Sequence, residues 1–438
     1  MTRVAVIGGG ISGIATAFYL TQRNFEVDLY EAADRIGGRI GSEILDGRWL
    51  DFGGKNIGKK YSLFRDFVKQ CGPLDYEYFG FNTSQIINDR VVSINKEGAK
   101  LFNTLRLIGL CGFDGIRKLS PLVLAILQDR QQGALDSDYF NRLAEQNDQL
   151  SLAGFLNEPC LSNIVRPVTV RMNGAEPDEC YPGNFGSNLA LVLDSYEQLK
   201  HGMHGMLDAF QGKAKVGSLR VLTGHSVTSI SSDQMTDTIS IGYMHGVTPA
   251  TAVYDRVISA LPATRLSVLL DESLPKVSAL LRQVRYYPVA VALVKYSYDV
   301  FDKSQRAMVF DHSFPLSNAG AYGINDLNLV RYTFSGRVSR SVISANSDPE
   351  EVIALGEQIA SPYFAIRGNI RESFAYRYLS EGLCAYSQLH QRLLRNIDKQ
   401  LEPFAGFAAT GDYRRGASIE ACFRAAGECV DTLFRGMY

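Results

Sequence analysis

The stretch RVAVIGGGISG at residues 3–13, followed by Glu31 at the end of EVDLYE, decides the fold. VAVI is an apolar run typical of a buried parallel strand, and apolar residues recur at helical spacing just after it. Gly8 permits the tight turn, Gly10 lets the backbone approach a pyrophosphate, and Gly13 lets the helix pack against the sheet. Glu31 is placed to bind the hydroxyls of an adenosine ribose. This strand–helix–strand unit predicts a dinucleotide cradle, whose contacts are Gly8, Gly10, Ile11, Ser12, Gly13, Glu31 and Ala32.

Length and composition narrow the class of protein. The 438 residues are too many for one ordinary core, so we expect two or three intertwined domains. A net charge of −1 argues against nucleic acid as a partner. The seven cysteines are scattered without a CxxC pair, which favours reduced thiols in a cytoplasmic protein and predicts no metal site.

No stretch has the length of a transmembrane helix, because LRLIGLCGF is followed at once by Asp114, Arg117 and Lys118. The cradle begins at residue 3, which leaves no room for a cleaved signal. Amphipathic spacing predicts mainly helices between residues 60 and 201, with one strand pair in TSQIIND and RVVSI. Core packing is the favoured role of these helices, and peripheral membrane contact stays open. Oligomeric state leaves no mark in the sequence.

Two further motifs follow the acid. RIGGRIGS at residues 35–42 contains Gly38 and Arg39, and DGRWLDFGGKNIG at 46–58 contains Gly53 and Gly54. Together with GGGISG and the terminal acid, they resemble the start of the flavin-containing amine oxidase and protoporphyrinogen oxidase superfamily. The resemblance implies that the dinucleotide is FAD, that Arg39 holds its pyrophosphate, and that Gly53 and Gly54 lie near the isoalloxazine ring.

The C-terminal segment resembles the end of a flavoprotein: a helix, the strand FAGFAAT, Gly411-Asp412, a loop, and a helix starting near Ser418. Asp412 can bind the ribitol, and the helix N-terminus can stabilise negative charge at the flavin N1–C2=O region. Within the superfamily, the R-Y-L-S-E and G-D-Y layout is closer to protoporphyrinogen-oxidase-like members. The further cofactor contacts that the resemblance implies are Gly38, Arg39, Gly53, Gly54, Val227, Ala260, Gly411, Asp412, Ser418 and Ile419.

These observations predict an α/β fold, α+β overall, with three parts. A discontinuous Rossmann-like FAD-binding domain comprises residues 1–60, 200–265 and 395–438. A substrate domain built on a mixed sheet comprises 80–95 and 266–394, and a helical subdomain comprises 96–199. Strands are predicted in AMVFDH, GAYGIN, LNLVRYTFSG and SRSVISA, and a helix in EEVIALGEQIA. We expect the sheet to form the pocket floor, with its other face toward solvent.

Four residues are candidates for catalysis: Lys55, Asn56, His204 and Tyr413. Lys55 either binds an anionic substrate, stabilises reduced flavin, or is a solvated loop lysine. His204, with His201 in LKHGMHGM, is either a proton carrier or a solvated loop histidine. Tyr413 is a candidate for half of an aromatic cage beside the flavin.

One departure from the amine oxidases concerns their active-site lysine. The matching strand is YPVAVALVKY, where that position falls on Val291, although a shifted register would place it on Lys295. The favoured function is therefore an FAD oxidase or desaturase that abstracts hydride from a C–N or C–C bond of a small, largely apolar metabolite in a biosynthetic pathway, with O2 as acceptor. The alternatives are an amine or amino-acid oxidase that releases H2O2, and a flavin-dependent isomerase or mutase without net oxidation.

Overall fold

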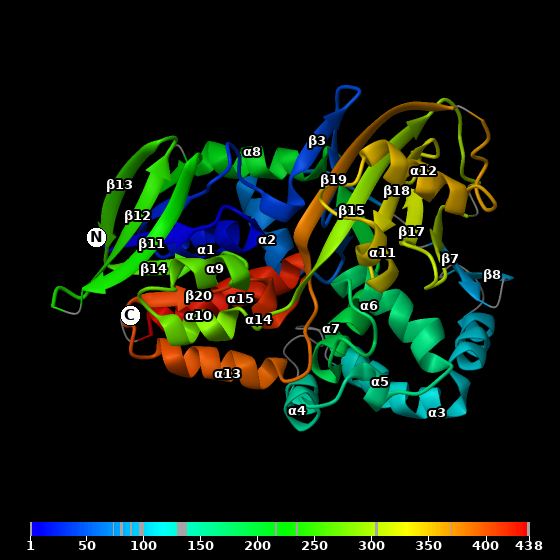
Figure 1. The fold of residues 1–438 in the computed structure, drawn as a ribbon, viewed down its shortest axis with the longest axis horizontal. Helices are drawn as coiled ribbons and strands as arrows, with labels where there is room; N and C mark the ends of the chain where they lie inside the picture. The colour runs from blue at the N-terminus through cyan, green and yellow to red at the C-terminus, as the bar shows by residue number, and fades with distance from the viewer. Residues whose placement is uncertain are drawn as a thin grey trace.

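A computed structural model gives the arrangement of residues 2–72, 74–78, 82–87, 90–95, 100–128, 138–214, 217–233, 235–302, 305–368 and 370–435. The chain forms three groups of elements, and both termini lie at the same end of the molecule (Figure 1). A parallel sheet with its helices occupies that end, a larger mixed sheet lies at the other end, and a group of helices lies below the mixed sheet in the same view.

The parallel sheet joins segments from distant parts of the chain. Its strand order is β10-β2-β1-β14-β20, and the strands are β1 (Arg3–Ile7), β2 (Glu26–Tyr30), β10 (Leu219–Leu222), β14 (Arg256–Ser259) and β20 (Phe407–Ala409). Val4 and Val6 of β1 face one apolar cluster, whereas Ala5 and Ile7 face another. Because both faces of the strand are covered, its sequence is a continuous apolar run.

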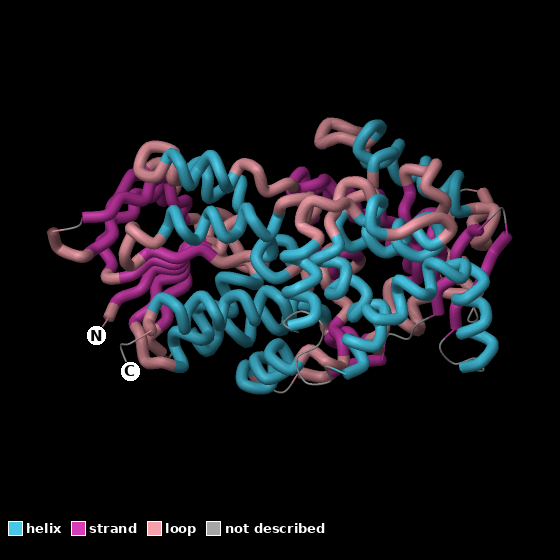
Figure 2. Tube along the Cα trace, turned by 90° about the horizontal axis from the view of Figure 1, so that it is seen from below, coloured by secondary structure: helices cyan, strands magenta, loops and turns pink. Residues whose placement is uncertain are grey.

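Helices and a β-meander cover the two faces of this sheet (Figure 2). One face is covered by α1 (Ile11–Gln22), α2 (Ser62–Cys71), α8 (Gly202–Ala214) and α15 (Ile419–Leu433). The other face carries the meander β11 (His225–Asp233), β12 (Thr238–His245) and β13 (Thr248–Tyr254), with α9 (Ala263–Leu269), α10 (Pro275–Leu281) and α13 (His390–Leu401). The predicted fold class, with a sheet assembled from separate segments, is confirmed.

The second sheet is mixed, as predicted. Its order is β19-β15-β18-β17-β16-β7-β8, and among the described strands only β16 and β7 pair in parallel. The strands are β7 (Asn82–Ile87), β8 (Arg90–Asn95), β15 (Tyr286–Tyr296), β16 (Ala307–Val309), β17 (Leu316–Ala321), β18 (Leu329–Phe334) and β19 (Arg371–Cys384). The long strands β15 and β19 pair with each other at one edge of this sheet, on the side toward the parallel sheet (Figure 1).

Three predictions about the second sheet are wrong. The strand predicted in GAYGIN ends at Ala321, because β17 lies earlier, at Leu316–Ala321, and a turn follows it. SRSVISA is not a strand: it contributes to the helix α11 (Arg337–Val342), which begins after Gly336 turns the chain at φ +96°. The outer face of the sheet is not open to solvent either, because α12 (Pro349–Ala360) packs its Ile353 against Tyr332 and Phe334 of β18. The apolar residues on both faces of YPVAVALVKY are the sequence sign of a sheet covered on both sides.

The segment between residues 60 and 201 is mainly helical, with α3 (Lys100–Gln128), α4 (Asp138–Gln146), α5 (Leu152–Phe155), the π-helical turn η2 (Leu161–Val165), α6 (Arg166–Asn173) and α7 (Pro182–Val192). It also holds two strands that the sequence did not predict, β6 (Tyr76–Tyr78) and β9 (Tyr196–Leu199), which form a small sheet with β5 (Ile57–Gly58) just before the segment. The 3-10 turn η1 (Gly38–Ile40) precedes the hairpin β3 (Ser42–Leu45) and β4 (Arg48–Asp51). Within the described residues, no helix is both long and apolar enough to cross a bilayer.

Candidate cofactor and active site

The glycines of the first turn have the geometry that a dinucleotide requires. A Cβ at Gly13 would lie 1.8 Å from the carbonyl oxygen of Gly8, and Gly8 itself has φ +104°. At Gly10, by contrast, a Cβ would meet no heavy atom within 4 Å. Gly38 packs close to the Cα of Gly10. A side chain is therefore excluded at Gly13 by packing and disfavoured at Gly8 by its φ. Gly10 instead borders open space at the N-terminus of α1, where a phosphate group is favoured.

Glu31 closes the other side of the cradle. Its carboxylate accepts hydrogen bonds from the backbone N–H of Gly9 at 2.7 Å and of Ala33 at 2.9 Å. The Glu31 carbonyl accepts from the N–H of His225 at 2.9 Å, which brings the start of β11, and with it the segment of Val227, beside the cradle. The N–H of Ala260 donates to the carbonyl of Ile7 at 2.8 Å. The contacts predicted from β2, β11 and the end of β14 therefore surround the glycine turn between β1 and α1.

The two ends of the chain meet at Asp412. The Nη1 of Arg39 lies 2.7 Å from Oδ2 of Asp412, and the Tyr286 hydroxyl donates to Oδ1 at 3.0 Å. Burial opposes the charge of Arg39, but the neighbouring Asp412 carboxylate outweighs it and raises the pKa of the guanidinium. Asp412 begins the short helix α14 (Asp412–Arg415), and Ser418 caps α15 by accepting from the N–H of Ala421 at 3.0 Å.

The predicted flavin loop lies between these two ends. A Cβ at Gly53 would be 2.0 Å from the Arg39 carbonyl oxygen, so only glycine fits there. A Cβ at Gly54 would be 3.5 Å from Cδ1 of Ile419, the first residue of α15. The cradle, the GGR turn, the flavin loop and the C-terminal helix are therefore adjacent in space.

These residues fit an extended dinucleotide. About a third of the Arg39 side chain, 34%, stays accessible although burial still affects its pKa, as expected for a group that faces an internal cavity. The helices α1 and α15 both begin beside that space, so their first backbone N–H groups border it. Gly10 and Gly54 have no side chain that would fill it. Glu31 would hold the ribose, the start of α1 the phosphates, and Asp412 the ribitol.

Lys55 is buried, with 5% of its surface exposed. Its Nζ donates to Oε1 of Gln198 at 2.8 Å and to the carbonyl of Tyr322, and it lies 4.6 Å from the centre of the Tyr322 ring. Burial, reinforced by the positive charge of Arg331, lowers the pKa of this amine well below its ordinary value. The interpretation of Lys55 as a solvated loop lysine is therefore wrong.

Arg331 on β18 shares this region, and the sequence analysis missed it. Its Nη2 donates to the carbonyl of Phe52 at 2.7 Å and its Nη1 to the hydroxyl of Thr333 at 2.7 Å, while its buried Nε has no hydrogen-bond partner. Burial lowers the pKa of Arg331 to about 10. The signal for this residue, and for Gln198 and Tyr322, is weak, because each lies on a different element and only the tertiary fold unites them.

The other three catalytic candidates do not gather around Lys55. Asn56 is exposed. The His204 ring stacks on Trp49 with 3.6 Å between ring centroids, and its Nε2 lies 3.0 Å from the carboxylate of Asp208, on the outer side of α8. Tyr413 is fully buried in the apolar cluster that includes residues of α13, and its hydroxyl has no hydrogen-bond partner.

The register of β15 determines whether Val291 or Lys295 lies at the position of the active-site lysine of the amine oxidases. Val291 is buried in the apolar cluster that contains Phe52 of the flavin loop. Lys295, two positions along the same face from Leu293, forms ion pairs with Asp46 at 3.0 Å and Glu372 at 3.3 Å. Lys295 is therefore held at the end of the β3–β4 hairpin and not beside Phe52.

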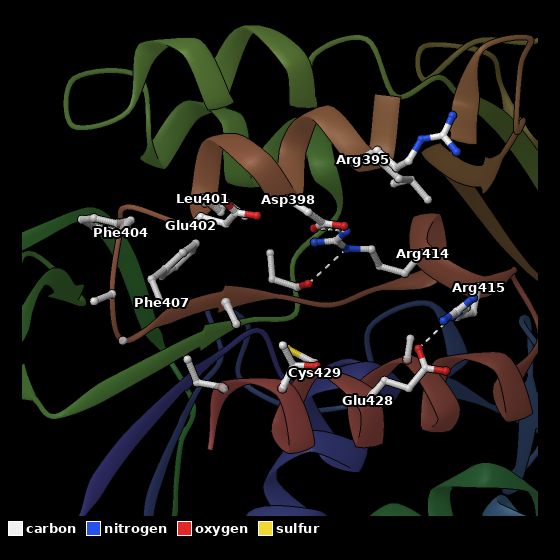
Figure 3. Close-up of a pocket in the computed structure, with 18 of the residues that line it drawn as sticks. Arg395, Asp398, Leu401, Glu402, Phe404, Phe407, Arg414, Arg415, Glu428 and Cys429 are labelled. Atoms are coloured by element: carbon white, nitrogen blue, oxygen red, sulfur yellow. Dashed lines mark hydrogen bonds and ion pairs between the residues drawn. The ribbon is translucent and has the colours of Figure 1, made fainter. Parts of the chain in front are cut away.

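A large groove lies apart from this site. It encloses about 600 Å³ beside β20, between α13 and α15 (Figure 3). Its lining includes neither the cradle glycines nor Asp412. Two of its arginines are paired within the lining, since Arg414 pairs with Asp398 at 2.6 Å and Arg415 with Glu428 at 2.8 Å. We therefore assign the cofactor to the cradle and not to this groove.

A dinucleotide sheet closed by a C-terminal helix, with a separate mixed sheet beside it, defines the class of FAD-binding oxidoreductases. Comparison with known proteins agrees: a family profile described as "Flavin containing amine oxidoreductase" matches residues 11–429. The chain belongs to that family, and its cofactor is FAD. The predicted family, cofactor and enzyme class are confirmed.

Individual relatives are distant. The chain is 23% identical over 461 residues to coproporphyrinogen III oxidase of Mycobacterium tuberculosis (strain ATCC 25618 / H37Rv), covering 99% of this chain and 97% of that protein. Other matches are shorter: 28% identity over 102 residues with the L-amino acid oxidase of Cerastes cerastes covers 22% of this chain and 20% of that protein. Among solved structures, cyclohexylamine oxidase from Brevibacterium oxydans IH-35A superimposes with a TM-score of 0.72 at 17% identity, covering 100% of this chain and 99% of that one. That likeness shows the fold alone.

Proposed function

We propose that this protein is an FAD-dependent oxidase or desaturase that removes hydride from a C–N or C–C bond of a small, largely apolar metabolite and passes the electrons to O2. The observation that carries the proposal is the meeting of Arg39 with Asp412 and of Gly54 with Ile419, directly before the buried amine of Lys55. Alignment with a porphyrinogen oxidase over nearly its whole length supports a biosynthetic role.

The substrate carbon would lie between the flavin loop and the inner face of the mixed sheet. Bound FAD supplies the hydride acceptor. The chain contributes an apolar wall from Val291, Leu293 and Phe52, which excludes water and orients an apolar body.

Lys55 is the group in this region best suited to move a proton. Both of its hydrogen bonds to Gln198 and Tyr322 are donated by the nitrogen, and a neutral amine can donate them as well. Because burial lowers the pKa of Lys55, the neutral form is accessible nearer to physiological pH than for an exposed lysine. We propose that Lys55 accepts a proton from the substrate as the hydride leaves.

The test uses purified holoprotein without air. Candidate metabolites are added, and loss of the visible flavin absorbance reports hydride transfer. Admission of air, with O2 uptake and peroxide measured together, then identifies the acceptor. Bleaching followed by reoxidation with O2 uptake supports the proposal. Bleaching only by simple amines would indicate an amine oxidase, and substrate conversion without any O2 uptake would indicate an isomerase. Either result contradicts the proposed function.

A further inference from the structure

The amine of Lys55 is one end of a hydrogen-bonded chain that leads into the small sheet β5-β9-β6. Its Nζ donates to Oε1 of Gln198 at 2.8 Å, and Nε2 of the same amide donates to Oε1 of Glu77. Gln198 on β9 and Glu77 on β6 are direct partners in the antiparallel register. Gln198 is buried, whereas Glu77 is half-buried. The small sheet therefore joins the buried amine to a carboxylate nearer the surface.

The two neighbours of Gln198 fix the orientation of its amide. An ionised carboxylate accepts hydrogen bonds and donates none, so the amide NH2 faces Glu77 and the amide oxygen faces Lys55. The amide is also closely packed, because a Cβ at Gly323 would lie 3.1 Å from Nε2 of Gln198. The second partner of Lys55 is the carbonyl of Tyr322, the residue before this glycine. Lys55 is thus held between two oxygens that only accept.

These two oxygens determine the direction of the lone pair of Lys55. A neutral amine has two N–H groups and one lone pair. With one N–H directed at Gln198 and the other at Tyr322, the lone pair is directed away from both. If the Gln198 amide turned over, its NH2 would donate to the lone pair, and the amine could no longer accept a proton from another group. The orientation of one amide therefore decides whether Lys55 can act as a base.

The charged groups that act on Lys55 come from several elements. Three carboxylates favour the charged amine, while burial and one guanidinium oppose it. The carboxylates are Asp51 of β4, Glu77 of β6 and Asp326 between β17 and β18, and the guanidinium is Arg331 of β18. Asp326 is paired with Arg48 through two contacts, at 2.7 and 2.9 Å, and Asp51 accepts the N–H of Met203 at 3.0 Å. Glu77 acts on the amine both by its charge and through the Gln198 amide.

We propose that Glu77 is a positioning residue, which holds the Gln198 oxygen toward Lys55 and so keeps the lone pair of the neutral amine for the proton of the substrate. This inference rests on the proposed function, because it states how Lys55 is prepared for the proton transfer proposed there. One proton moves from the substrate to Nζ. The ammonium that forms keeps both donated hydrogen bonds, and the negative charge of Glu77 stabilises it.

The test is the pH titration of Lys55 in the oxidised holoprotein, prepared with lysine that carries carbon-13 at Cε and followed by NMR. The Lys55 signal is the one that Lys55→Met removes. Glu77→Gln keeps an acceptor oxygen but loses the charge, so the midpoint should shift to lower pH. Glu77→Leu also loses the acceptor and lets the amide turn over. The neutral amine then gains a hydrogen bond, and its midpoint should shift lower still.

The matched control is Glu197→Gln. Glu197 is next to Gln198 in the sequence, but its side chain lies on the opposite face of β9 and pairs with Arg65 at 2.7 Å. This variant should leave the Lys55 midpoint unchanged. Glu77→Ala removes the acceptor without a bulky side chain and should give the same midpoint as Glu77→Leu. Bound FAD and unchanged signals of the other lysines report that each variant is folded.

Midpoints that fall in the order parent, Glu77→Gln, Glu77→Leu support the inference. It is wrong if the parent and Glu77→Leu titrate alike, if Glu77→Leu and Glu77→Ala titrate no lower than Glu77→Gln, or if Glu197→Gln shifts the midpoint as far as Glu77→Gln does. It is also wrong if Lys55 does not titrate between about pH 5 and 11. The titration needs no substrate, so a protein with these midpoints that oxidises no metabolite would refute only the oxidase function. An active oxidase whose midpoints do not change would refute only the inference.

Discussion

Replacing Gly10 by alanine separates cofactor binding from folding. Gly10 has an extended backbone with φ −73° and ψ −179°, which any residue adopts, and an added Cβ meets no heavy atom within 4 Å. Loss of a favourable N-cap residue and gain from a less flexible unfolded chain oppose each other, so Gly10→Ala should change the stability of the apoprotein by less than about 1 kcal/mol.

The same methyl group would enter the space that the pyrophosphate must occupy. Close approach of the backbone at this position is the reason for the glycine, and forcing a methyl group into a well-packed contact costs about 1–3 kcal/mol. The dissociation constant for FAD should therefore rise about 5- to 150-fold. The measurement is titration of apoprotein with FAD, followed by flavin fluorescence, next to thermal unfolding of the apoprotein.

Two other glycines provide the comparison. Gly212→Ala on α8 also meets no atom within 4 Å, and because it lies away from the cradle it should leave FAD affinity unchanged. Gly13→Ala should destabilise the apoprotein itself, since its Cβ would be 1.8 Å from the Gly8 oxygen. If Gly10→Ala binds FAD as tightly as the parent protein, the assignment of the cradle fails.

Three further predictions concern other parts of the site. Ser418→Ala removes the hydrogen bond to the N–H of Ala421 and should cost about 1 kcal/mol of unfolding free energy, measured by denaturant titration. Lys55→Met removes a buried amine, so the apoprotein should unfold at an equal or higher temperature while kcat/KM falls at least about tenfold; a fall in both would point to a structural lysine. His390, whose Nε2 donates to the Tyr413 carbonyl at 2.8 Å, has a pKa lowered by burial from its ordinary 6.5. Because the unfolded chain takes up this proton first, stability should fall as the pH drops below about 6.5, and His390→Gln should reduce that dependence in thermal unfolding curves.

The sequence was informative where a motif is local and its chemistry strict. Gly8, Gly13 and Gly53 are positions where backbone contacts or a positive φ exclude a side chain, and such constraints mark the sequence directly. The Arg39–Asp412 contact joins residues 373 positions apart, yet each end carries its own motif. These features allowed the fold class, the cofactor and both ends of the site to be predicted.

The sequence was uninformative where several elements contribute one residue each. Arg331 lies in LVRYTF, where alternation places Arg331 and Tyr332 on opposite faces of the strand. The pattern does not say which of the two faces meets the cofactor domain. Lys55 stands in a run with Lys59 and Lys60, and only the fold shows that it alone of the three is buried. Arg337 begins a helix and not a strand because Gly336 turns the chain before it, a tertiary constraint that local composition does not reveal.

Three buried cations have one physical property in common, which is that burial lowers the pKa of Lys55, Arg331 and Arg171. Such groups oppose folding, because each charge leaves water without full compensation by a carboxylate. Buried carboxylates show the opposite shift for the same reason: burial raises the pKa of Glu420, although two N–H groups at the start of α2 donate to it, and it raises the pKa of Asp51. Asp51, Lys55 and Arg331 are coupled to one another by their charges. Burial therefore favours the neutral forms of both the acid and the amine beside the flavin loop, which is the condition under which Lys55 can accept a proton.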